Sequence, residues 1–439
     1  MKAIKFETNF NKNKYFSSVT LLSNTKYNNQ EKNLINIYPE INYQEILGFG
    51  GAFTESSGYC LSIIDNKIRQ NILNDYFSNE GLAYSFCRTH IGSCDFSLST
   101  YSYLKNNNID NFSIDKDKKF LIPMIKDALK INPNLTLLAS PWSPPSFMKN
   151  TKLSILGGKL EPKYYQLYSE YLAKYIEEYK RQEIKISYIT IQNEPNAIQA
   201  WESCLFNSVD EFIFATEYLS NTFKRKHIDT KIICWDHNKE KLFSRAIQTI
   251  GKDKSNLLSG MAIHWYSGDY FEEIALTKQF FPDKLIIHTE GCTGFSNFRK
   301  NDEIQNGEIY GHDIIGDLNS GINAFIDWNM VLDNNGGPNH KKNYCNAPIM
   351  LTKNNSGYIK NLTYYYIGHF SKFIKPGAKR IGFSKFTNKL EITCFKNIDN
   401  SIVIVILNRT NENITYYINL REELMKDTIN SHSIITYVC

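Results

Sequence analysis

The chain has 439 residues, of which 42% are hydrophobic and 22% are charged. This composition is ordinary for a soluble globular protein, and the length allows a barrel plus a smaller module. The formal charge of +5 is too small to indicate a nucleic-acid partner.

The N-terminus, MKAIKFETNFNKNKYFSS, carries charge but no apolar segment of signal-peptide type, and no stretch reaches the length of a membrane span. The nine cysteines are scattered without a Cys-x-x-Cys pair, which argues against a zinc site and a disulfide framework. Reduced, buried thiols are typical of cytosolic proteins. We therefore expect a cytoplasmic location, no integral membrane segment and no metal.

Between residues 45 and 375, strand and helix patterns alternate, as in βα units around parallel strands. Eight apolar stretches predict strands: Gly48–Phe53, Tyr84–Arg88, Leu135–Ser140, the run through Ile189 that ends at Glu194, Lys231–Trp235, Met261–Trp265, Lys284–Glu290 and Asn323–Trp328. The clearest amphipathic helices between them are Tyr164–Tyr179, Val209–Lys224 and Phe271–Phe280. The pattern favours an α/β fold, a (β/α)8 TIM barrel, over an open doubly wound sheet. No nucleotide-binding glycine loop occurs, and no cofactor is expected.

After residue 375 the pattern changes to strands separated by Asn- and Asp-rich turns. The expected strands are Lys389–Phe395, Ser401–Leu407, Ile414–Leu420 and Ser433–Val438. This pattern is typical of a β-sandwich, and the strand-like stretch Asn33–Tyr38 is expected to join it. The predicted domains are residues 1–44 with strands of the sandwich, 45–375 as the barrel and 376–439 as the C-terminal β-sandwich.

Two of the predicted strands end on a carboxylate. One runs into Asn193-Glu194-Pro195, and the other ends at Glu290 before Gly291. Strand ends of a parallel barrel project into one mouth, where such folds keep their chemistry. A retaining glycosidase needs an acid/base carboxyl and a nucleophilic carboxylate about 5 Å apart. The sequence therefore predicts such an enzyme, with Glu194 as acid/base, Glu290 as nucleophile and Asn193 as donor to the sugar 2-hydroxyl.

At this point the chain resembles glycoside hydrolase family 30, the glucosylceramidase-like group of retaining enzymes. The matching stretches lie in family order along the barrel: Gly48–Glu55, Arg88–Phe96, Ala139–Pro145, Gln192–Pro195, His264–Tyr266, Thr289–Cys292, Asp327–Asn339 and Tyr366–Phe373. The resemblance implies the same roles for Glu194 and Glu290.

Other site residues follow from the resemblance. Asp95, Trp142, Asn193 and Trp328 match the residues that hold the sugar hydroxyls, and Asn343 is expected to line the entrance. His264 and Tyr266 are expected to hydrogen-bond a catalytic carboxylate. Arg88, at a strand end, is expected to keep a catalytic carboxylate ionised by charge pairing. With Glu290 ionised, Glu194 should hold its proton to higher pH.

Two departures from the family pattern concern the leaving-group side. The chain runs directly from Asn196 to Cys204 where an insertion is usual, which makes Trp201 a candidate platform, and His340 stands where a tryptophan is usual. No apolar element for a lipid stands out beside the mouth.

The leading interpretation is an exo-acting β-glucosidase for a small β-glycoside or oligosaccharide, including glucosylceramide-type substrates of sphingolipid metabolism. The alternatives are a β-xylosidase or β-1,6-glucanase of the same family, a catalytically silent sugar-binding barrel and a metal-dependent hydrolase. The last would need His and Asp gathered at strand ends, and the scattered histidines argue against it. The sequence does not predict the oligomeric state.

Overall fold

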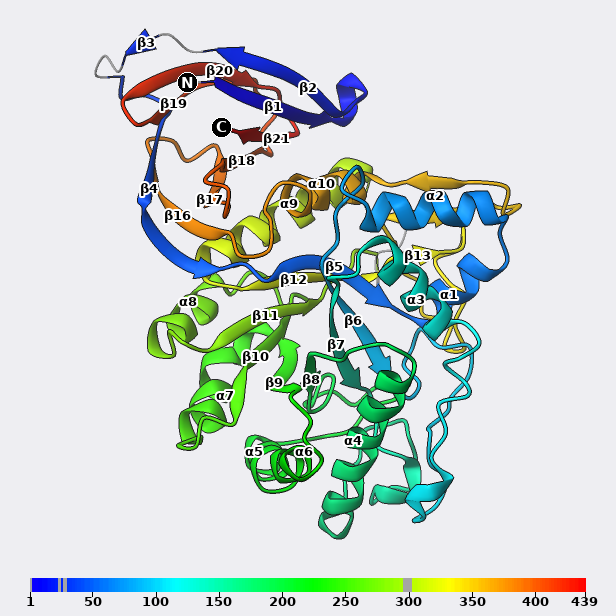
Figure 1. Cartoon of the computed structure of the whole chain (residues 1–439). Coiled ribbons are helices and arrows are strands. Elements are labelled where there is room, and N and C mark those ends of the chain that lie inside the picture. Colours follow the sequence, from blue (N-terminus) through cyan, green and yellow to red (C-terminus); the bar gives the residue numbers. More distant parts are fainter. Residues whose placement is uncertain (1, 23–24, 27–29, 295–301) are drawn as a thin grey trace.

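The computed structural model describes the whole chain except residues 1, 23–24, 27–29 and 295–301. Its centre is a closed barrel of eight parallel strands, which confirms the predicted fold class. A second, mostly antiparallel sheet packs at one side of the barrel (Figure 1). No helix in the described part of the chain is long and apolar enough to cross a membrane.

The eight barrel strands correspond to the eight predicted ones, with shifted ends. They are β5 (Gly48–Phe53), β6 (Phe86–Ile91), β7 (Thr136–Pro141), β8 (Tyr188–Thr190), β9 (Lys231–Asn238), β10 (Leu258–His264), β11 (Leu285–Glu290) and β12 (Ala324–Asn329). The largest shift is in β8, which ends at Thr190. Beyond Thr190 the chain remains bonded to the end of β7, through Gln192 Nε2 to Trp142 O and Asn193 N to Pro141 O.

Helices surround the barrel (Figure 1). They are α1 (Glu55–Ser62), α2 (Asn66–Phe77), α3 (Leu121–Ile131), α4 (Tyr165–Arg181), α5 (Ser208–Ile213), α6 (Ser220–Arg225), α7 (Leu242–Gln248), α8 (Phe271–Phe280), α9 (Glu303–Ser320) and α10 (Leu362–Ser371). The predicted helix over 209–224 is a continuous run in which a π-helical segment, Phe214–Leu219, separates α5 from α6. A small sheet of β13 (Val331–Leu332), β14 (Ile349–Leu351) and β15 (Tyr358–Lys360) brackets the loop that carries Asn343.

The second sheet combines both ends of the chain in the strand order β2-β1-β21-β18-β17-β16-β4-β19-β20-β3. Its members are β1 (Lys2–Asn9), β2 (Lys14–Leu22), β3 (Thr25–Lys26), β4 (Leu34–Glu45), β16 (Lys379–Lys385), β17 (Glu391–Lys396), β18 (Ile402–Asn408), β19 (Ile414–Leu420), β20 (Glu423–Ile429) and β21 (Ser433–Val438). The sequence missed β16 and β20. Both carry several charged residues, which hide the alternation of buried positions.

Strand β18 joins the two parts of the molecule because both of its faces are buried. Its side chains alternate: Val403, Val405 and Leu407 pack into the core that includes the barrel, while Ile402, Ile404 and Ile406 pack into the core of the second sheet. The period of two residues in a strand produces this division. The two parts therefore share a continuous apolar junction.

Truncation of Leu407 tests this junction. Leu407 is completely buried on the face of β18 that packs toward the barrel, so Leu407→Ala should lower the free energy of unfolding by about 2–5 kcal/mol. The matched control, Ile398→Ala, changes a side chain that is 75% exposed and should cost less than about 0.5 kcal/mol. Equal effects in urea denaturation would contradict the described packing.

Candidate active site

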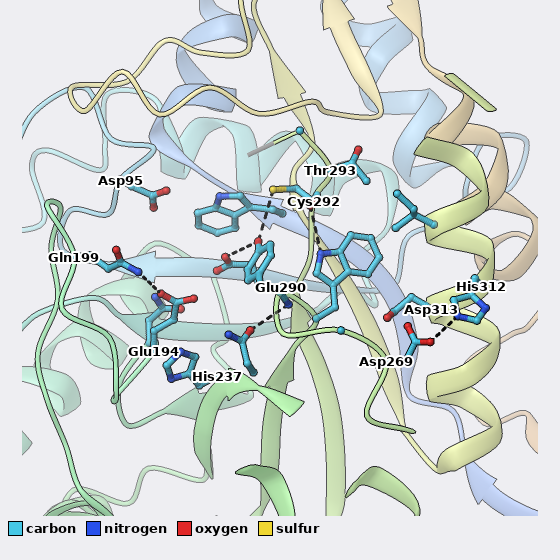
Figure 2. A pocket seen from close by; sticks show the side chains of 18 of the residues that line it. Asp95, Glu194, Gln199, His237, Asp269, Glu290, Cys292, Thr293, His312 and Asp313 are labelled. Atoms are coloured by element: carbon cyan, nitrogen blue, oxygen red, sulfur yellow. Dashed lines mark hydrogen bonds and ion pairs between the residues drawn. The ribbon is translucent and has the colours of Figure 1, made fainter. Parts of the chain in front are cut away.

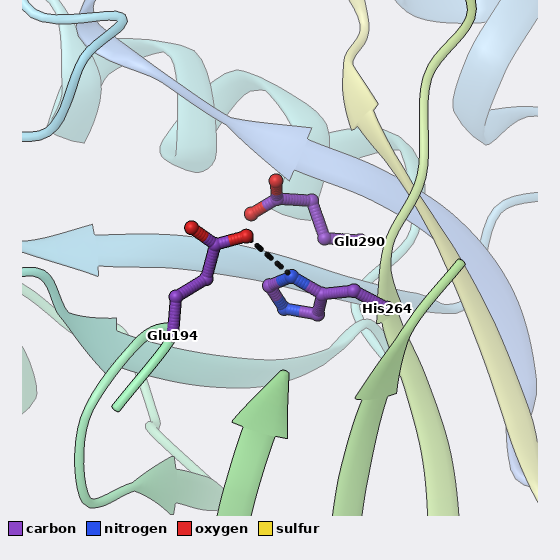
Figure 3. A group of neighbouring side chains, drawn as sticks. All are labelled: Glu194, His264 and Glu290. Carbon is purple, nitrogen blue, oxygen red and sulfur yellow. Dashed lines mark ion pairs between the residues drawn. The ribbon is translucent and has the colours of Figure 1, made fainter. Parts of the chain in front are cut away.

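Glu194 and Glu290 meet at the carboxyl ends of the barrel strands (Figure 3). Glu290 is the last residue of β11, and Glu194 lies four residues beyond β8. One oxygen of each carboxyl group and a ring nitrogen of His264 all lie within 4.8 Å of one another. Glu194 adopts a left-handed backbone with φ of 48°, and its N–H donates to Asp236 O at 2.9 Å. The distance between the carboxyl groups of Glu194 and Glu290 suits attack by a carboxylate on the anomeric carbon. It is shorter than the gap that an inverting enzyme needs for a water.

Arg88 organises the floor of the site. Its guanidinium is fully buried and donates to Glu290 Oε2 at 2.6 Å, to Asp236 Oδ2 at 2.8 Å and to Asn193 Oδ1 at 2.8 Å. It also lies under the Trp142 ring, 4.7 Å from the centroid. Arg88 therefore fixes the orientation of Glu290 and turns the Asn193 amide so that its Nδ2 faces away from the guanidinium.

Asp236 belongs to this site although sequence reasoning missed it. It is completely buried and accepts hydrogen bonds from Ser140, Thr190 and Thr289 in addition to Arg88. Arg88 and His264 outweigh the effect of its burial and hold the pKa of Asp236 below its ordinary value, so it stays ionised. The signal that could have found it is its place directly after the predicted strand Lys231–Trp235, the pattern that singled out Glu290.

His264 lies between three carboxylates. Nδ1 is 3.4 Å from Glu194 Oε1, and Nε2 is 3.2 Å from Asp236 Oδ1. Burial alone would lower its pKa, but Glu290, Asp236 and Glu194 together raise it to about 9. His264 is therefore a buried cation at neutral pH. It lies close to both catalytic carboxyls, Glu194 and Glu290.

This cation changes the expected order of ionisation. Burial and the charge of Glu194 raise the pKa of Glu290, whereas hydrogen bonding from His264 and the nearby His237 lower the pKa of Glu194 despite its burial. The prediction that Glu194 holds its proton to higher pH beside an ionised Glu290 took no account of His264, which lowers the pKa of both carboxyl groups. Two carboxyls this close titrate as a pair that shares a proton.

The catalytic carboxylates open into a cavity of about 510 Å³ (Figure 2). The residues that line it include Asp95, Trp142, Asn193, Trp201, Tyr266 and Trp328, whose roles in sugar binding or as a platform stay predictions. The Trp142 and Trp328 rings stack at 5.3 Å and form an almost buried aromatic wall. An aromatic face of this kind packs against the C–H surface of a sugar.

Asp95 and Tyr266 provide polar contacts in the cavity. Tyr266 OH donates to Glu290 Oε1 at 2.9 Å, so it holds the nucleophile from the side opposite Arg88. Burial and the charges of Glu290 and Glu194 raise the pKa of Asp95 well above its ordinary value. A protonated Asp95 can both donate to and accept from sugar hydroxyls.

Asn343 is not among the side chains that line the cavity, contrary to the prediction for this residue. Its Nδ2 instead donates to Asp95 Oδ2 at 2.9 Å, so it supports the sugar site from behind. The reason is the loop between β13 and β14, where Asn339 Oδ1 accepts from Asn343 N and Asn339 Nδ2 donates to Asn343 O.

Gln199 and His237 are further cavity residues that the sequence did not indicate. Gln199 Nε2 donates to Glu194 Oε2 at 3.4 Å (Figure 2). Gln199 lies in the shortened segment after Glu194, in which only Trp201 was predicted as a site residue.

Within the described part of the chain, histidines gather with carboxylates in two places, which corrects the expectation that they are scattered. One group is Glu194, His264 and Glu290, and the other is His288, Asp313 and Asp317. Side-chain cations already neutralise both groups: Arg88 pairs with Glu290, and Lys239 Nζ lies 2.7 Å from both Asp313 and Asp317. A metal cation in either group would meet these charges at close range, which disfavours it.

The barrel, the paired carboxylates and the aromatic wall define a retaining glycoside hydrolase. A family model described as the glycosyl hydrolase family 30 TIM-barrel domain matches residues 46–374, and one described as the family 30 beta sandwich domain matches residues 377–437. The chain belongs to glycosyl hydrolase family 30, as the resemblance implied.

Similar sequences include putative glucosylceramidase 3 of Caenorhabditis elegans, which is 35% identical over 80% of this chain and 70% of that protein. Lysosomal acid glucosylceramidase of Mus musculus is 29% identical over 92% of this chain and 83% of that protein. Among solved structures, SrfJ from Salmonella typhimurium has a TM-score of 0.97 and 33% identity, covering 100% of this chain and 99% of its own. The endo-β1,6-glucanase BT3312 has a TM-score of 0.90 and 27% identity over the same shares.

The role of His264 predicts a shift in pH dependence. Protonated His264 lowers the pKa of both catalytic carboxyls, so His264→Gln should raise both pKa values. The acid limb of the kcat/KM profile follows ionisation of the nucleophile, and the alkaline limb follows loss of the proton shared by the pair. Both limbs should therefore move to higher pH by about one unit, measured with an aryl glycoside. Exposed His227 is the control, since His227→Gln should leave the profile in place. A profile of His264→Gln that stays in place or moves to lower pH would refute this role.

Proposed function

We propose that the protein is an exo-acting β-glucosidase that releases glucose from an amphiphilic β-glucoside of the glucosylceramide type. The observation that carries the sugar part of this proposal is the sugar end of the cavity, where Asp95, Trp142 and Trp328 are each no more than 5% exposed. A nearly buried end fits one terminal sugar better than the interior of a chain. The sequence relatives named above as glucosylceramidases support the same assignment.

The geometry supports a double displacement. Glu290, oriented by Arg88 and Tyr266, attacks the anomeric carbon while Glu194 gives its proton to the departing oxygen. The glycosyl–Glu290 ester then carries no charge. Glu194 accordingly takes a proton from water, and the resulting attack releases the sugar with retained configuration. Asn193 Nδ2 is placed to donate to the 2-hydroxyl, a bond that strengthens in the transition state.

Exposed apolar side chains on the loop that follows Glu194 and on a loop bonded to it support a lipid-like leaving group. Leu153, Leu156 and Ile198 are 48%, 53% and 64% exposed. They lie on two loops that are joined by the bond from Leu156 N to Gln199 O at 2.8 Å, and Gln199 contacts Glu194. The leaving group departs past Glu194, so this apolar rim of Leu153, Leu156 and Ile198 is where an alkyl chain would pack. The sequence did not reveal it because the two loops are separated along the chain.

A β-1,6-glucanase is the second candidate. The similarity to BT3312 and to an endo-1,6-β-D-glucanase of Neurospora crassa favours it. Hydrolysis of nitrophenyl β-glucoside, nitrophenyl β-xyloside, glucosylceramide in detergent and β-1,6-gluco-oligosaccharides separates these activities. The proposal expects turnover of glucosylceramide and release of single glucose units, and release of internal fragments from the oligosaccharides would contradict it.

The two carboxylates have separable phenotypes. Glu290→Gln should lower kcat by at least about 10⁴-fold on every substrate, because no nucleophile remains. Glu194→Ala should be most damaging for substrates with alkyl leaving groups and least damaging for aryl glucosides, whose leaving groups need little protonation. Equal losses on both kinds of substrate in Glu194→Ala would show that Glu194 is not the acid.

The apolar rim is tested by a double change, Leu156→Ser with Ile198→Ser. Each apolar side chain that packs on a lipid contributes about 1–2 kcal/mol. The double variant should therefore lose roughly tenfold or more in kcat/KM for glucosylceramide while keeping its activity on nitrophenyl β-glucoside. Phe386→Ser, which changes a 58% exposed side chain directly after β16 of the second sheet, is the control. Unchanged glucosylceramide turnover in the double variant would exclude a lipid role for the rim.

A further inference from the structure

A chain of charged side chains connects the second sheet to the active-site cavity. Arg409, just after β18, donates from Nε to Glu391 Oε1 at 2.5 Å, and Glu391 Oε2 lies 2.6 Å from His312 Nδ1 on α9. His312 Nε2 in turn lies 3.0 Å from Asp269 Oδ2, as Figure 2 shows. Asp269, His312 and Arg409 also line the cavity.

Asp269 belongs to the loop that presents Tyr266 to the nucleophile. This loop joins β10 to α8, and Tyr266 OH donates to Glu290 Oε1. Its second half is conformationally demanding: Gly268 has φ of 114°, and Tyr270, which is not a glycine, has φ of 35°. A bulky residue in the left-handed region costs free energy and persists only where the surroundings hold it.

Helix α9 is a firm anchor for that loop. The ring of Phe271, the first residue of α8, lies 5.6 Å from the His312 ring, and Gly316 leaves the space on α9 that Phe271 fills. Tyr270 and Asp269 immediately precede Phe271. The Asp269–His312 pair and the Phe271 packing therefore hold the end of the loop from two sides.

We propose that Asp269 and His312 are positioning residues. Their ion pair, called the latch below, holds the β10–α8 loop so that Tyr266 can orient the nucleophile Glu290. Glu391 and Arg409 extend the latch into the second sheet. The second sheet then contributes to catalysis as well as to stability. The latch acts on the nucleophile, so it applies whatever the leaving group and does not depend on the proposed substrate.

The charges around His312 are consistent with this role. The groups that face it are Glu391, Asp269 and Arg409, from β17, the β10–α8 loop and the residue after β18. Hydrogen bonding to Glu391, together with Asp269, raises the pKa of His312 above its ordinary value despite partial burial and the Arg409 charge. His312 thus stays protonated to higher pH than a free histidine, and the latch weakens as pH rises through that raised pKa.

The experiment compares Asp269→Ala and His312→Gln with a matched control, His432→Gln. His432 also joins a carboxylate across the junction, with Nδ1 2.8 Å from Glu308 Oε1, and is as exposed as His312, but it does not contact the loop. With nitrophenyl β-glucoside, the two latch variants should lose roughly three- to thirtyfold in kcat with KM changed less than twofold. The loss should be the same for a second aryl glucoside with a different leaving group. His432→Gln should keep wild-type kcat.

A double-mutant cycle with Tyr266→Phe decides whether the latch acts through Tyr266. In the Tyr266→Phe background, Asp269→Ala should have less than a twofold further effect on kcat. Full additivity, a wild-type kcat in both latch variants, or an equal loss in His432→Gln would overturn the proposal. A loss confined to KM or to one leaving group would also overturn it, because the residues would then bind substrate directly. Asp269→Asn, which keeps the shape of the side chain, serves if the alanine variant does not fold. If instead the proposed substrate is wrong, the wild-type protein will fail to hydrolyse glucosylceramide or will release internal fragments from the β-1,6-gluco-oligosaccharides.

Discussion

The buried guanidinium of Arg88 is the interaction on which the site depends. A completely buried charge is tolerated only when its hydrogen bonds and charge are fully matched, and here Glu290, Asp236, Asn193 and Ser140 provide that match. Ser140, Asp236 and Glu290 lie in three different strands and Asn193 follows a fourth, so the closed barrel brings them to one point. Removing any one would leave a buried charge poorly compensated, so the positions of Glu290, Asn193 and the Trp142 ring all depend on Arg88.

Charge balance accounts for the protonation of the site. Two buried cations, Arg88 and His264, face the three carboxyl groups of Asp236, Glu194 and Glu290. A single proton shared by the catalytic pair makes this group neutral, as a poorly hydrated site requires. Once Glu290 becomes an ester, one negative charge disappears, and Glu194 can ionise to act as the base. The same pair therefore supplies both halves of the reaction.

The sequence predicted the features that repeat with the βα unit: eight apolar strands and carboxylates at strand ends. It missed features that depend on long-range proximity. Asp269 and His312 are 43 residues apart, and Arg409 comes from another domain, so no local pattern links them. It also took no account of the effect of His264 on the two catalytic carboxyls, because that effect depends on which groups surround its ring. The sequence predicted that Asn343 lines the entrance, whereas the loop between β13 and β14 directs its side chain to Asp95.

Trapping of the intermediate tests the central claim most directly. The protein is incubated with 2-deoxy-2-fluoro-β-glucosyl fluoride, whose fluorine slows breakdown of the glycosyl ester, and is then digested and analysed by mass spectrometry. The account predicts one added 2-fluoroglucosyl group per chain, on Glu290, with loss of activity that recovers as the ester turns over. Labelling of another residue, or inversion of configuration in the product of the wild type, would contradict it.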